Sequence, residues 1–362
     1  MKISLNWLKD YIDLPESPAD IAHMLTMSGL EVEGIEEIEP VKGGLRGVVI
    51  GEVIECNRHP NADKLSVTKV DIGLEQPVPI VCGAPNVAKG QKVVVATTGT
   101  TLYLPDGKEF VIKKAKIRGE VSEGMICAED ELGLGTDHSG IMVLDTTLPD
   151  GTPASEYFDL ETDTVLEIGL TPNRADGTSH IGVARDLRAL LNRPVKWPEV
   201  SGFKPDNTSR PVDVVVENTE ACPRYSGLTI TGIKIAESPD WLKKKLMAIG
   251  QLPINNVVDI TNYVLHEMGQ PLHAFDLDKI KGDKIMVKTL PEGTLFVTLD
   301  EKKRTLRSTD LMICHASEGM SIAGVFGGID SGVTDSTTSI FLESACFSPD
   351  YIRRTSMLHC LK

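Results

Sequence analysis

Aromatic residues and long apolar runs are both scarce in this sequence. Phe, Trp and Tyr make up 5% of its 362 residues, so it offers few of the stacking rings on which single-strand nucleic-acid binders depend. No apolar run approaches the roughly 18 to 20 residues of a membrane helix. Asn6, Lys9 and Asp10 interrupt the N-terminus, where a secretory signal needs an apolar stretch. We therefore expect neither membrane insertion nor secretion.

Paired cysteines are also lacking. The seven cysteines are scattered, odd in number and without a C-x-x-C pair. This pattern favours reduced thiols in a cytoplasmic protein over a disulfide framework or a zinc site. The cysteines are Cys56, Cys82, Cys127, Cys222, Cys314, Cys346 and Cys360.

Positive charge is in deficit, with a formal net charge of −15. Bulk electrostatics would therefore repel a polyanion, and a nucleic-acid partner would need a local basic patch. Such a patch is present on the segment predicted as the last strand of a barrel. Between residues 108 and 118, five basic residues accompany one acid, Glu109, giving a local charge of +4. The basic residues are Lys108, Lys113, Lys114, Lys116 and Arg118.

Two further basic residues, Arg58 and Lys64, lie on the loop NRHPNADKL. Basic groups on a groove neutralise phosphates and release counterions, which gives salt-dependent and nearly sequence-blind binding. Charge alone is equally compatible with a solvated strand face, so it leaves both interpretations open.

The length and the distribution of turn residues predict an α+β multidomain protein. Residues 39–150 contain five short strand-like segments bounded by Gly, Pro or Asn, as in a small OB-fold barrel. We expect this barrel to be inserted into a small α/β domain formed by residues 1–38 and 151–195. The proline-rich residues 196–211 predict a linker, and residues 212–362 predict a mixed α/β third domain.

The stretch NYVLHEMGQPLHAFDLD resembles a zinc-protease pattern only in part. His266 and Glu267 begin H-E-x-x-H, but the fifth residue is Gln270. Gly269 and Pro271 would break the helix that must hold both ligands on one face. We therefore expect no metal site, and we assign His266 and Glu267 to the helix surface.

Longer segments carry a resemblance to known families. RHPNADKLSVTKVDIG, IVCGAPNV and IKKAKIRGEVSEGMICAEDELGL resemble the tRNA-binding barrel attached to several aminoacyl-tRNA synthetases. A second resemblance, to the β subunit of bacterial phenylalanyl-tRNA synthetase, extends over essentially the whole chain. It rests on the segments MKISLNWLKDYIDLP, SGLEVEGIE, LTPNRADGTSHIGVARDLRALL, VVDITNYVLHEMGQPLHAFDLDKI, AGVFGGIDSGV and FLESACFSP. The first resemblance implies an OB-fold that grips structured tRNA by its backbone and shape.

The second resemblance implies an N-terminal fragment, because members of this family are considerably longer. The parent would attach phenylalanine to its tRNA in an α2β2 tetramer. Its ATP and Mg²⁺ would bind at the α subunit, so we expect no cofactor in this fragment. The partners implied are phenylalanine-specific tRNA and the α subunit, with no membrane.

The resemblance also implies that the third domain is an editing domain that hydrolyses mischarged tyrosyl-tRNA. A pocket shaped for phenylalanine rejects one added hydroxyl by only about a hundredfold. A second site with a buried acceptor for that hydroxyl discriminates by about 10⁴ to 10⁵. By the resemblance this acceptor is Glu343. Gly327 and Gly328 permit close backbone approach to a ligand, so their N–H groups could bind the substrate carbonyl or wall the pocket, and the alternative is a tight turn.

Thr261, Asn262 and His273 match polar residues that line the editing pocket of the family. A neutral imidazole near pH 7 can hold and polarise a water, so His273 is the expected positioning group, with general base as a stronger alternative. Cys346 has no histidine nearby in the sequence, which disfavours covalent catalysis. A Thr-x-Ala segment that shapes the family's pocket would follow the last residue, so we expect weakened editing by the fragment.

Two alternatives to an editing enzyme remain. The chain could be a non-catalytic tRNA-binding or assembly module, in which His273 has no effect on deacylation. It could also be a metal-dependent hydrolase, which Gln270 already argues against.

Overall fold

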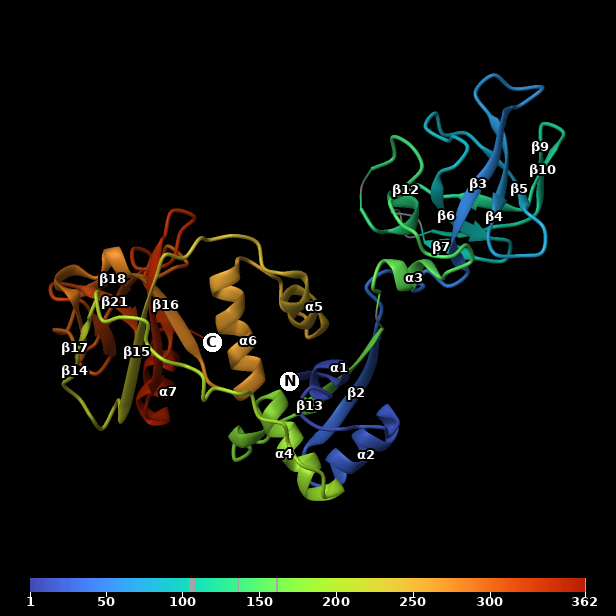
Figure 1. Ribbon diagram of the computed structural model, residues 1–362. Helices are drawn as coiled ribbons and strands as arrows, with labels where there is room; N and C mark the ends of the chain where they lie inside the picture. The colour runs from blue at the N-terminus through green and yellow to red at the C-terminus, as the bar shows by residue number, and fades with distance from the viewer. Residues whose placement is uncertain (104–107, 136, 161, 362) are drawn as a thin grey trace. The chain divides into compact units, whose positions relative to one another are not determined.

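The structure is a computed structural model that describes residues 1–103, 108–135, 137–160 and 162–361 (Figure 1). It separates into two compact units, residues 37–163 and residues 1–36 with 164–362. Each of the three predicted domains includes positions outside the described residues: 104–107 and 136 in the barrel, 161 in the small α/β domain and 362 in the third domain. Every helix within the described ranges is too short or too polar to cross a bilayer.

The unit of residues 37–163 is built on an antiparallel sheet that nearly closes on itself. Its strand order is β11-β6-β3-β4-β5, and β12 also pairs with β6. At the open edge, Glu123 N donates to the Pro79 carbonyl at 2.8 Å, and Val81 N donates to Ser122 Oγ at 3.1 Å. The strands are β3 (Val48–Arg58), β4 (Ser66–Asp71), β5 (Val78–Cys82), β6 (Lys92–Thr97), β11 (Gly124–Ile126) and β12 (Val143–Leu144).

Both faces of β6 are buried, which explains its nearly continuous apolar sequence KVVVAT. Val93 and Val95 belong to one core cluster with Val53, whereas Val94 and Ala96 belong to a second. The second core is completed by irregular segments with η1 (Asp130–Leu132) and α3 (Ala154–Tyr157).

The predicted fifth strand of the barrel, FVIKKAKIRG, is wrong as a single strand. It divides into β8 (Glu109–Val111), paired with β7 (Thr101–Tyr103), and β9 (Ala115–Ile117), paired with β10 (Glu120–Ser122). Three lysines within the four residues KKAK provide no apolar face for the interior, so β11 takes the place beside β6. The basic stretch is also not on the last strand, because β10, β11 and β12 follow it.

The second unit contains the two flanks of the barrel. Its strands β1 (Lys2–Ser4), β13 (Asp163–Gly169) and β2 (Glu31–Ile38) form a sheet in that order. Helices α1 (Leu5–Leu8), α2 (Pro18–Met27) and α4 (His180–Leu191) contribute to the same core, and η2 (Ala175–Gly177) precedes α4. Ser17 caps α2 as predicted, since its side chain accepts from Asp20 N.

The rest of this unit has two larger sheets that share one core, and a two-stranded sheet of β18 and β19. The five-stranded sheet runs β14-β17-β20-β21-β22, and the three-stranded sheet runs β15-β23-β16. Phe275 and Phe341 from the smaller sheet lie in one cluster with Ile285, Val287 and Ile313 from the larger.

The bounds in this region are as follows. The strands are β14 (Asp213–Val216), β15 (Arg224–Thr231), β16 (Leu272–Asp276), β17 (Lys284–Thr289), β18 (Leu295–Val297), β19 (Lys303–Thr305), β20 (Leu311–Cys314), β21 (Gly319–Ile322), β22 (Phe326–Gly327) and β23 (Ser339–Cys346). The helices are α5 (Asp240–Ala248), α6 (Asn256–Met268), α7 (Pro349–Leu358), η3 (Leu277–Lys279) and η4 (Lys281–Asp283).

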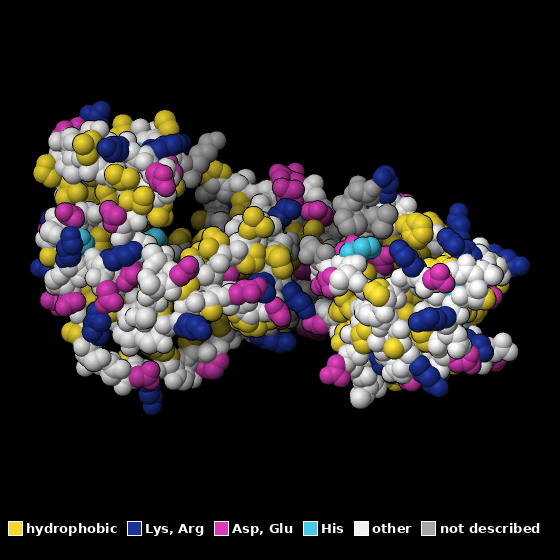
Figure 2. Space-filling model, turned by 90° about the horizontal axis from the view of Figure 1, so that it is seen from above, with side chains coloured by type: hydrophobic (Ala, Val, Ile, Leu, Met, Phe, Trp, Pro, Cys, Tyr) yellow, Lys and Arg dark blue, Asp and Glu magenta, His cyan; other side chains and the backbone are white. Residues whose placement is uncertain are grey.

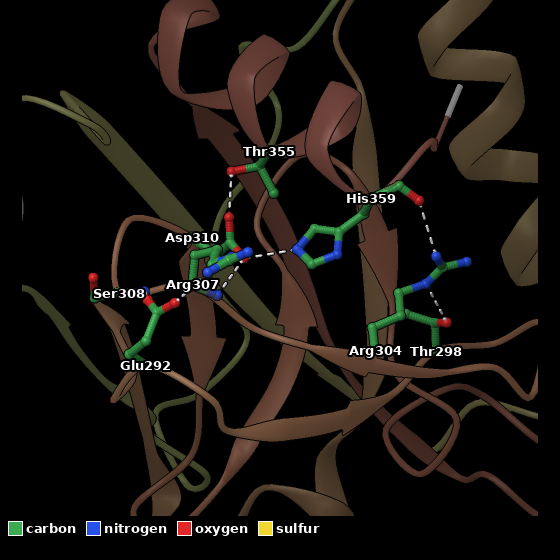
Figure 3. Close-up of polar contacts among 8 residues, drawn as sticks. All are labelled: Glu292, Thr298, Arg304, Arg307, Ser308, Asp310, Thr355 and His359. Carbon is green, nitrogen blue, oxygen red and sulfur yellow. Dashed lines mark hydrogen bonds and ion pairs between the residues drawn. The ribbon is translucent and has the colours of Figure 1, made fainter.

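A buried carboxylate fixes the end of α7 (Figure 3). Asp310 is 1% exposed and accepts hydrogen bonds from Thr355 Oγ1 at 2.9 Å, His359 Nε2 at 2.7 Å and Arg307 N at 2.9 Å. Arg304 donates to the His359 carbonyl at 3.1 Å. Because donors from α7 and from the segment before β20 converge on one group, the helix end is held against the larger sheet.

A second polar cluster joins α1 to α6. Glu267, predicted on the helix surface, is instead buried, so this prediction was wrong. Its carboxylate accepts from the Tyr11 hydroxyl at 2.6 Å and the Tyr263 hydroxyl at 3.2 Å. Trp7 Nε1 donates to the Tyr11 hydroxyl at 2.9 Å, and the Trp7 ring stacks on Tyr263. Hydrogen bonds satisfy this buried charge, which is the condition for burying it at all.

The neighbouring His180 is held in one neutral tautomer. Burial lowers the pKa of His180 to about 3. Its Nε2 accepts from Ser4 N at 3.2 Å, so Nδ1 carries the proton and donates to the His266 carbonyl at 2.8 Å. His266, assigned to the surface with Glu267, is half-buried and contributes this carbonyl.

We expect Tyr11→Phe to destabilise this unit by about 1 to 3 kcal/mol, since it removes the hydroxyl between Trp7 and Glu267. Urea unfolding of the variant should show a lower midpoint. Tyr351→Phe is the matched control, because the Tyr351 hydroxyl makes no hydrogen bond within the described part of the chain. Equal midpoints for the two variants would contradict a stabilising role for the cluster.

Candidate functional site

The smaller sheet brings two of the predicted site residues together. In its antiparallel register Glu343 on β23 faces His273 on β16 and Gly227 on β15. Directly opposed residues in an antiparallel pair point to the same face, with Cβ atoms about 4.5 to 5.5 Å apart. The carboxyl and the imidazole therefore share one side of the sheet, although 70 residues separate them in sequence.

Glu343 lies in a dry environment with one strong hydrogen bond. Glu343 is 6% exposed, and its Oε2 accepts a hydrogen bond from the Tyr225 hydroxyl at 2.6 Å. Burial raises the pKa of Glu343 to about 7, against the opposing effect of the Tyr225 hydrogen bond. The pKa of Tyr225 is raised by burial and by the adjacent Glu343, so its phenol stays a donor.

Tyr225 was missed in the sequence analysis. The signal for it is weak, because the alternation of RYSGLTIT predicts a strand but not its partner. A tyrosine two residues before Gly227 shares the face of Gly227, and the register then sets it beside Glu343.

His273 carries a buried atom that has no partner. Among the buried side-chain nitrogens and oxygens of the described residues, His273 Nε2 alone lacks a hydrogen bond. Burial lowers the pKa of His273, so the ring is neutral near pH 7. The ring packs edge-on against Phe275 with centroids 4.5 Å apart. Leaving such a group unpaired costs about 1 to 3 kcal/mol, which a water or ligand at Nε2 would recover.

Gly327 borders His273 directly. A Cβ at this position would lie 3.3 Å from His273 Cε1 and 2.8 Å from Leu299 Cδ1, so a side chain here would press on the ring. Leu299 and the imidazole therefore pack directly against Gly327, which only a residue without a side chain allows.

Gly328 faces a different direction from Gly327. Its Cβ would lie 2.5 Å from the Met320 carbonyl oxygen and 2.7 Å from Phe296 Cζ. Gly328 N already donates to that carbonyl at 2.9 Å, so this N–H is committed within the sheet region. The expectation that both glycine N–H groups face a substrate therefore does not fit Gly328.

Thr261 and Asn262 are half-buried on α6, which packs against β16. Thr261 Oγ1 donates to the Val258 carbonyl at 2.7 Å, within its own helix. Within the described residues neither side chain bonds to His273 or Glu343. Gly269 ends α6 in a left-handed conformation, as the sequence predicts.

The buried thiol near Glu343, that of Cys222, is a poor nucleophile. Burial, and then the charge of Glu343, raise the pKa of Cys222 to about 11. Cys346 at the end of β23 is exposed. A thiolate near neutral pH is what covalent catalysis would need, and the raised pKa disfavours one at Cys222.

In the barrel unit, hydrogen bonds join the loop after β3 to the β9–β10 hairpin, which lies far from it in the sequence. His59 Nδ1 accepts from Asn61 N at 3.0 Å, so Nε2 donates to the Ile117 carbonyl at 3.1 Å. Asn61 Nδ2 donates to the Arg118 carbonyl at 3.4 Å. These bonds fix the loop that carries Arg58 and Lys64 to the β9–β10 hairpin, a role of His59 and Asn61 that the sequence analysis missed.

The predicted tRNA-binding side chains on this surface are all exposed. They are Arg58, Lys64, Lys113, Lys114, Lys116 and Arg118. Lys114 pairs with Glu123 at 2.5 Å, while within the described ranges the other five have no acidic partner. Figure 2 shows Lys and Arg side chains projecting into solvent from this unit.

Two family models match the chain. The "Putative tRNA binding domain" matches residues 48–153, and the "B3/4 domain" matches residues 221–362. The chain is thus a multidomain protein that combines a tRNA-binding domain with a B3/4 domain.

Named relatives show which family with these two domains the chain belongs to. The "Phenylalanine--tRNA ligase beta subunit" of Bacteroides thetaiotaomicron is 57% identical, over 100% of this chain and 44% of the relative. That of Salinibacter ruber is 49% identical, over 98% of this chain and 44% of the relative. The chain belongs to the family of phenylalanine–tRNA ligase beta subunits, and it spans 44% of the length of these relatives.

A solved N-terminal fragment of the phenylalanyl-tRNA synthetase beta-subunit from Pyrococcus horikoshii is 16% identical over 52% of this chain and 58% of that chain. Its TM-score is 0.30, which supports no inference about the fold.

The raised pKa of Glu343 predicts a pH-dependent effect of Glu343→Gln. The folded carboxyl holds its proton up to about pH 7, against an ordinary value of 4.5. Folding stability that depends on this proton is therefore lost as pH rises from 4.5 to 7. Relative to wild type, the variant should gain about 2 to 3 kcal/mol in unfolding free energy between pH 5 and pH 8.

Urea unfolding at the two pH values measures this change. Glu220→Gln, at an exposed position, is the control and should show no such gain. A pH-independent difference for Glu343→Gln would mean that the carboxyl is ionised throughout.

Proposed function

We propose that this chain serves a phenylalanine–tRNA ligase by binding tRNA through residues 39–150 and by hydrolysing tyrosyl-tRNA through residues 212–362. The observation that carries the editing proposal is the cross-strand placement of Glu343 opposite His273, with His273 Nε2 unpartnered. The parent enzyme would attach phenylalanine to its tRNA as an α2β2 tetramer. ATP and Mg²⁺ would act at the α subunit; within the described residues no group of three His, Cys, Asp or Glu could hold a metal.

Glu343 would recognise the hydroxyl that distinguishes tyrosine from phenylalanine. The Tyr225 hydroxyl already donates to Oε2, and Oε1 of the same carboxyl remains for the substrate. A carboxylate accepts through both oxygens, so it can hold two phenols at once. Phenylalanine would leave Oε1 buried without a donor, and such a loss gives the large discrimination of polar sites.

His273 would position the attacking water. Its neutral Nε2 accepts a hydrogen bond from the water, whose oxygen bonds to the ester carbonyl carbon. The ester C–O bond to the terminal ribose then breaks, and the released hydroxyl takes the proton. Gly327 packs against the imidazole and would help to hold its orientation. Thr261 and Asn262 would supply a polar wall from α6.

Deacylation assays test this editing mechanism. We expect Glu343→Ala to slow hydrolysis of tyrosyl-tRNA by about 10- to 100-fold, the value of a hydrogen bond to a charged group. His273→Ala should slow it by about 10²-fold. Phenylalanyl-tRNA should stay resistant in both variants, and Glu220→Ala is the control.

The assays should compare this chain with one extended to the length of its relatives, where we expect the faster hydrolysis. Unchanged hydrolysis by His273→Ala in the longer chain would favour the non-catalytic tRNA-binding module instead.

The basic surface of the barrel unit would contact the tRNA backbone. Lys113, Lys116 and Arg118 are exposed and free of acidic partners within the described ranges, whereas Glu123 neutralises Lys114. Phosphate contacts release counterions, so each one adds to the salt dependence of binding. We therefore place the main contacts at the hairpin and its attached loop.

We expect the triple change Lys113→Ala, Lys116→Ala, Arg118→Ala to weaken tRNA binding at least tenfold. The slope of log affinity against log salt should fall by about 2 to 3. Lys69→Ala is the control, because Lys69 already pairs with Glu55 at 3.1 Å and is equally exposed. Filter binding over a salt series measures both quantities, and an unchanged slope in the triple variant would refute the assignment.

A further inference from the structure

A cavity of about 740 Å³ lies in the second unit, apart from the His273–Glu343 pair. Its lining comes from four segments, within residues 278–281, 290–297, 315–320 and 328–331. Neither His273 nor Glu343 is among the lining residues. Its size falls in the usual range of pockets for small organic ligands, about 300 to 1,000 Å³.

The floor of this cavity is apolar. Phe296 and Met320 are buried and line it together with Leu290, which packs against the core cluster of Phe296. Gly328 also lines it, and a Cβ there would strike the Phe296 ring. The floor can therefore cover a bulky apolar group.

The lining includes a mostly buried histidine whose ring N–H is reachable by solvent and has no acceptor among the described residues. His315 is 6% exposed, and its Nδ1 accepts from Ser317 N and Glu318 N, each at 3.2 Å. The ring proton is therefore on Nε2. The nearest carboxylate oxygen, on Glu318, is 3.9 Å away, beyond hydrogen-bond range. Among the described residues, nothing else accepts from Nε2.

His315 is also neutral near pH 7, because burial and then the charge of Lys281 lower its pKa. A neutral N–H that faces the cavity can donate to a bound ligand, and a carboxylate oxygen is the strongest acceptor for it.

The rim of the cavity offers both signs of charge. Lys281 is exposed and only loosely paired with Glu318, at 3.4 Å. Asp330 is exposed on the opposite segment and has no basic partner within the described residues. Such a rim matches a ligand that carries an anion and a cation close together.

We propose that this cavity binds a free α-amino acid with a bulky apolar side chain. The ligand carboxylate accepts from His315 Nε2 and lies near Lys281, and the ligand ammonium lies near Asp330. The apolar side chain rests on Phe296 and Met320. The proposal is for reversible binding, and it stands whether or not the chain edits tRNA.

Calorimetric titration of the 362-residue chain with L-phenylalanine tests the proposal. The key variant is His315→Asn, because the Asn carbonyl oxygen still accepts from Ser317 N and Glu318 N while the Nε2 donor is lost. We expect saturable binding to one site in wild type and at least tenfold weaker binding in His315→Asn. Phenethylamine, which lacks the carboxylate, should not bind measurably, and 3-phenylpropanoate should bind at least tenfold more weakly.

Glu343→Gln should bind L-phenylalanine as wild type does, which separates this cavity from the candidate editing site. Loss of binding in that variant, or undiminished binding by His315→Asn, would overturn the proposal, as would absence of saturable binding. Should His315→Asn fail to fold, Asp330→Asn at the exposed rim carries the test, with the same tenfold loss expected.

Discussion

The pairing of β23 between β15 and β16 is the constraint on which the candidate site depends. Side chains alternate along a strand, so a slip of one residue would turn Glu343 to the opposite face of the sheet. The register is held from both sides, because Phe341 and Phe275 oppose each other two residues away and enter the shared core. Apolar burial therefore fixes the position of a polar pair that could not fix itself.

The same burial sets the chemistry of the pair. Desolvation alone raises the pKa of Glu343 and lowers that of His273, moving both toward neutrality at physiological pH. Two groups that are neutral or nearly so can share one dry face without the cost of an unpaired charge. Tyr225 offsets part of the remaining penalty with its hydroxyl. The pKa of Glu343 thus lies near physiological pH, where a hydrogen bond donated by a substrate would favour the ionised carboxylate.

The structural features that the sequence predicted correctly are those whose causes lie within a few residues. The cap at Ser17 and the helix end at Gly269 follow from backbone chemistry within a few residues. Tertiary partners decided the features that were predicted wrongly. Glu267 looks like a surface residue until Tyr11, far away in sequence, packs against it. The segment FVIKKAKIRG has strand propensity, but its lysines stay exposed while Ile112 enters the core, so it does not form one barrel strand.

The candidate site shows the same division. The resemblance supplied Glu343, His273 and Gly327, but only the register places the first two face to face and the third beside the imidazole. Gly328 has a packing reason of its own, since Phe296 and the Met320 carbonyl occupy the space of its side chain. Neighbouring glycines in AGVFGG thus serve opposite sides of one strand end, a distinction that no sequence pattern contains.

The proline-rich residues 196–211 are predicted as a linker, and the contacts around them argue against a hinge there. Trp7 stacks on both His180 and Tyr263, and Tyr11 bonds to Glu267, so side chains before and after the linker form one packed cluster. A hinge motion would expose Glu267 and His180, or break the bonds that satisfy them. Buried polar groups tolerate that poorly. The linker therefore connects two parts of one compact unit, and the N-terminal segment of the chain packs against the α6 helix that borders the candidate site.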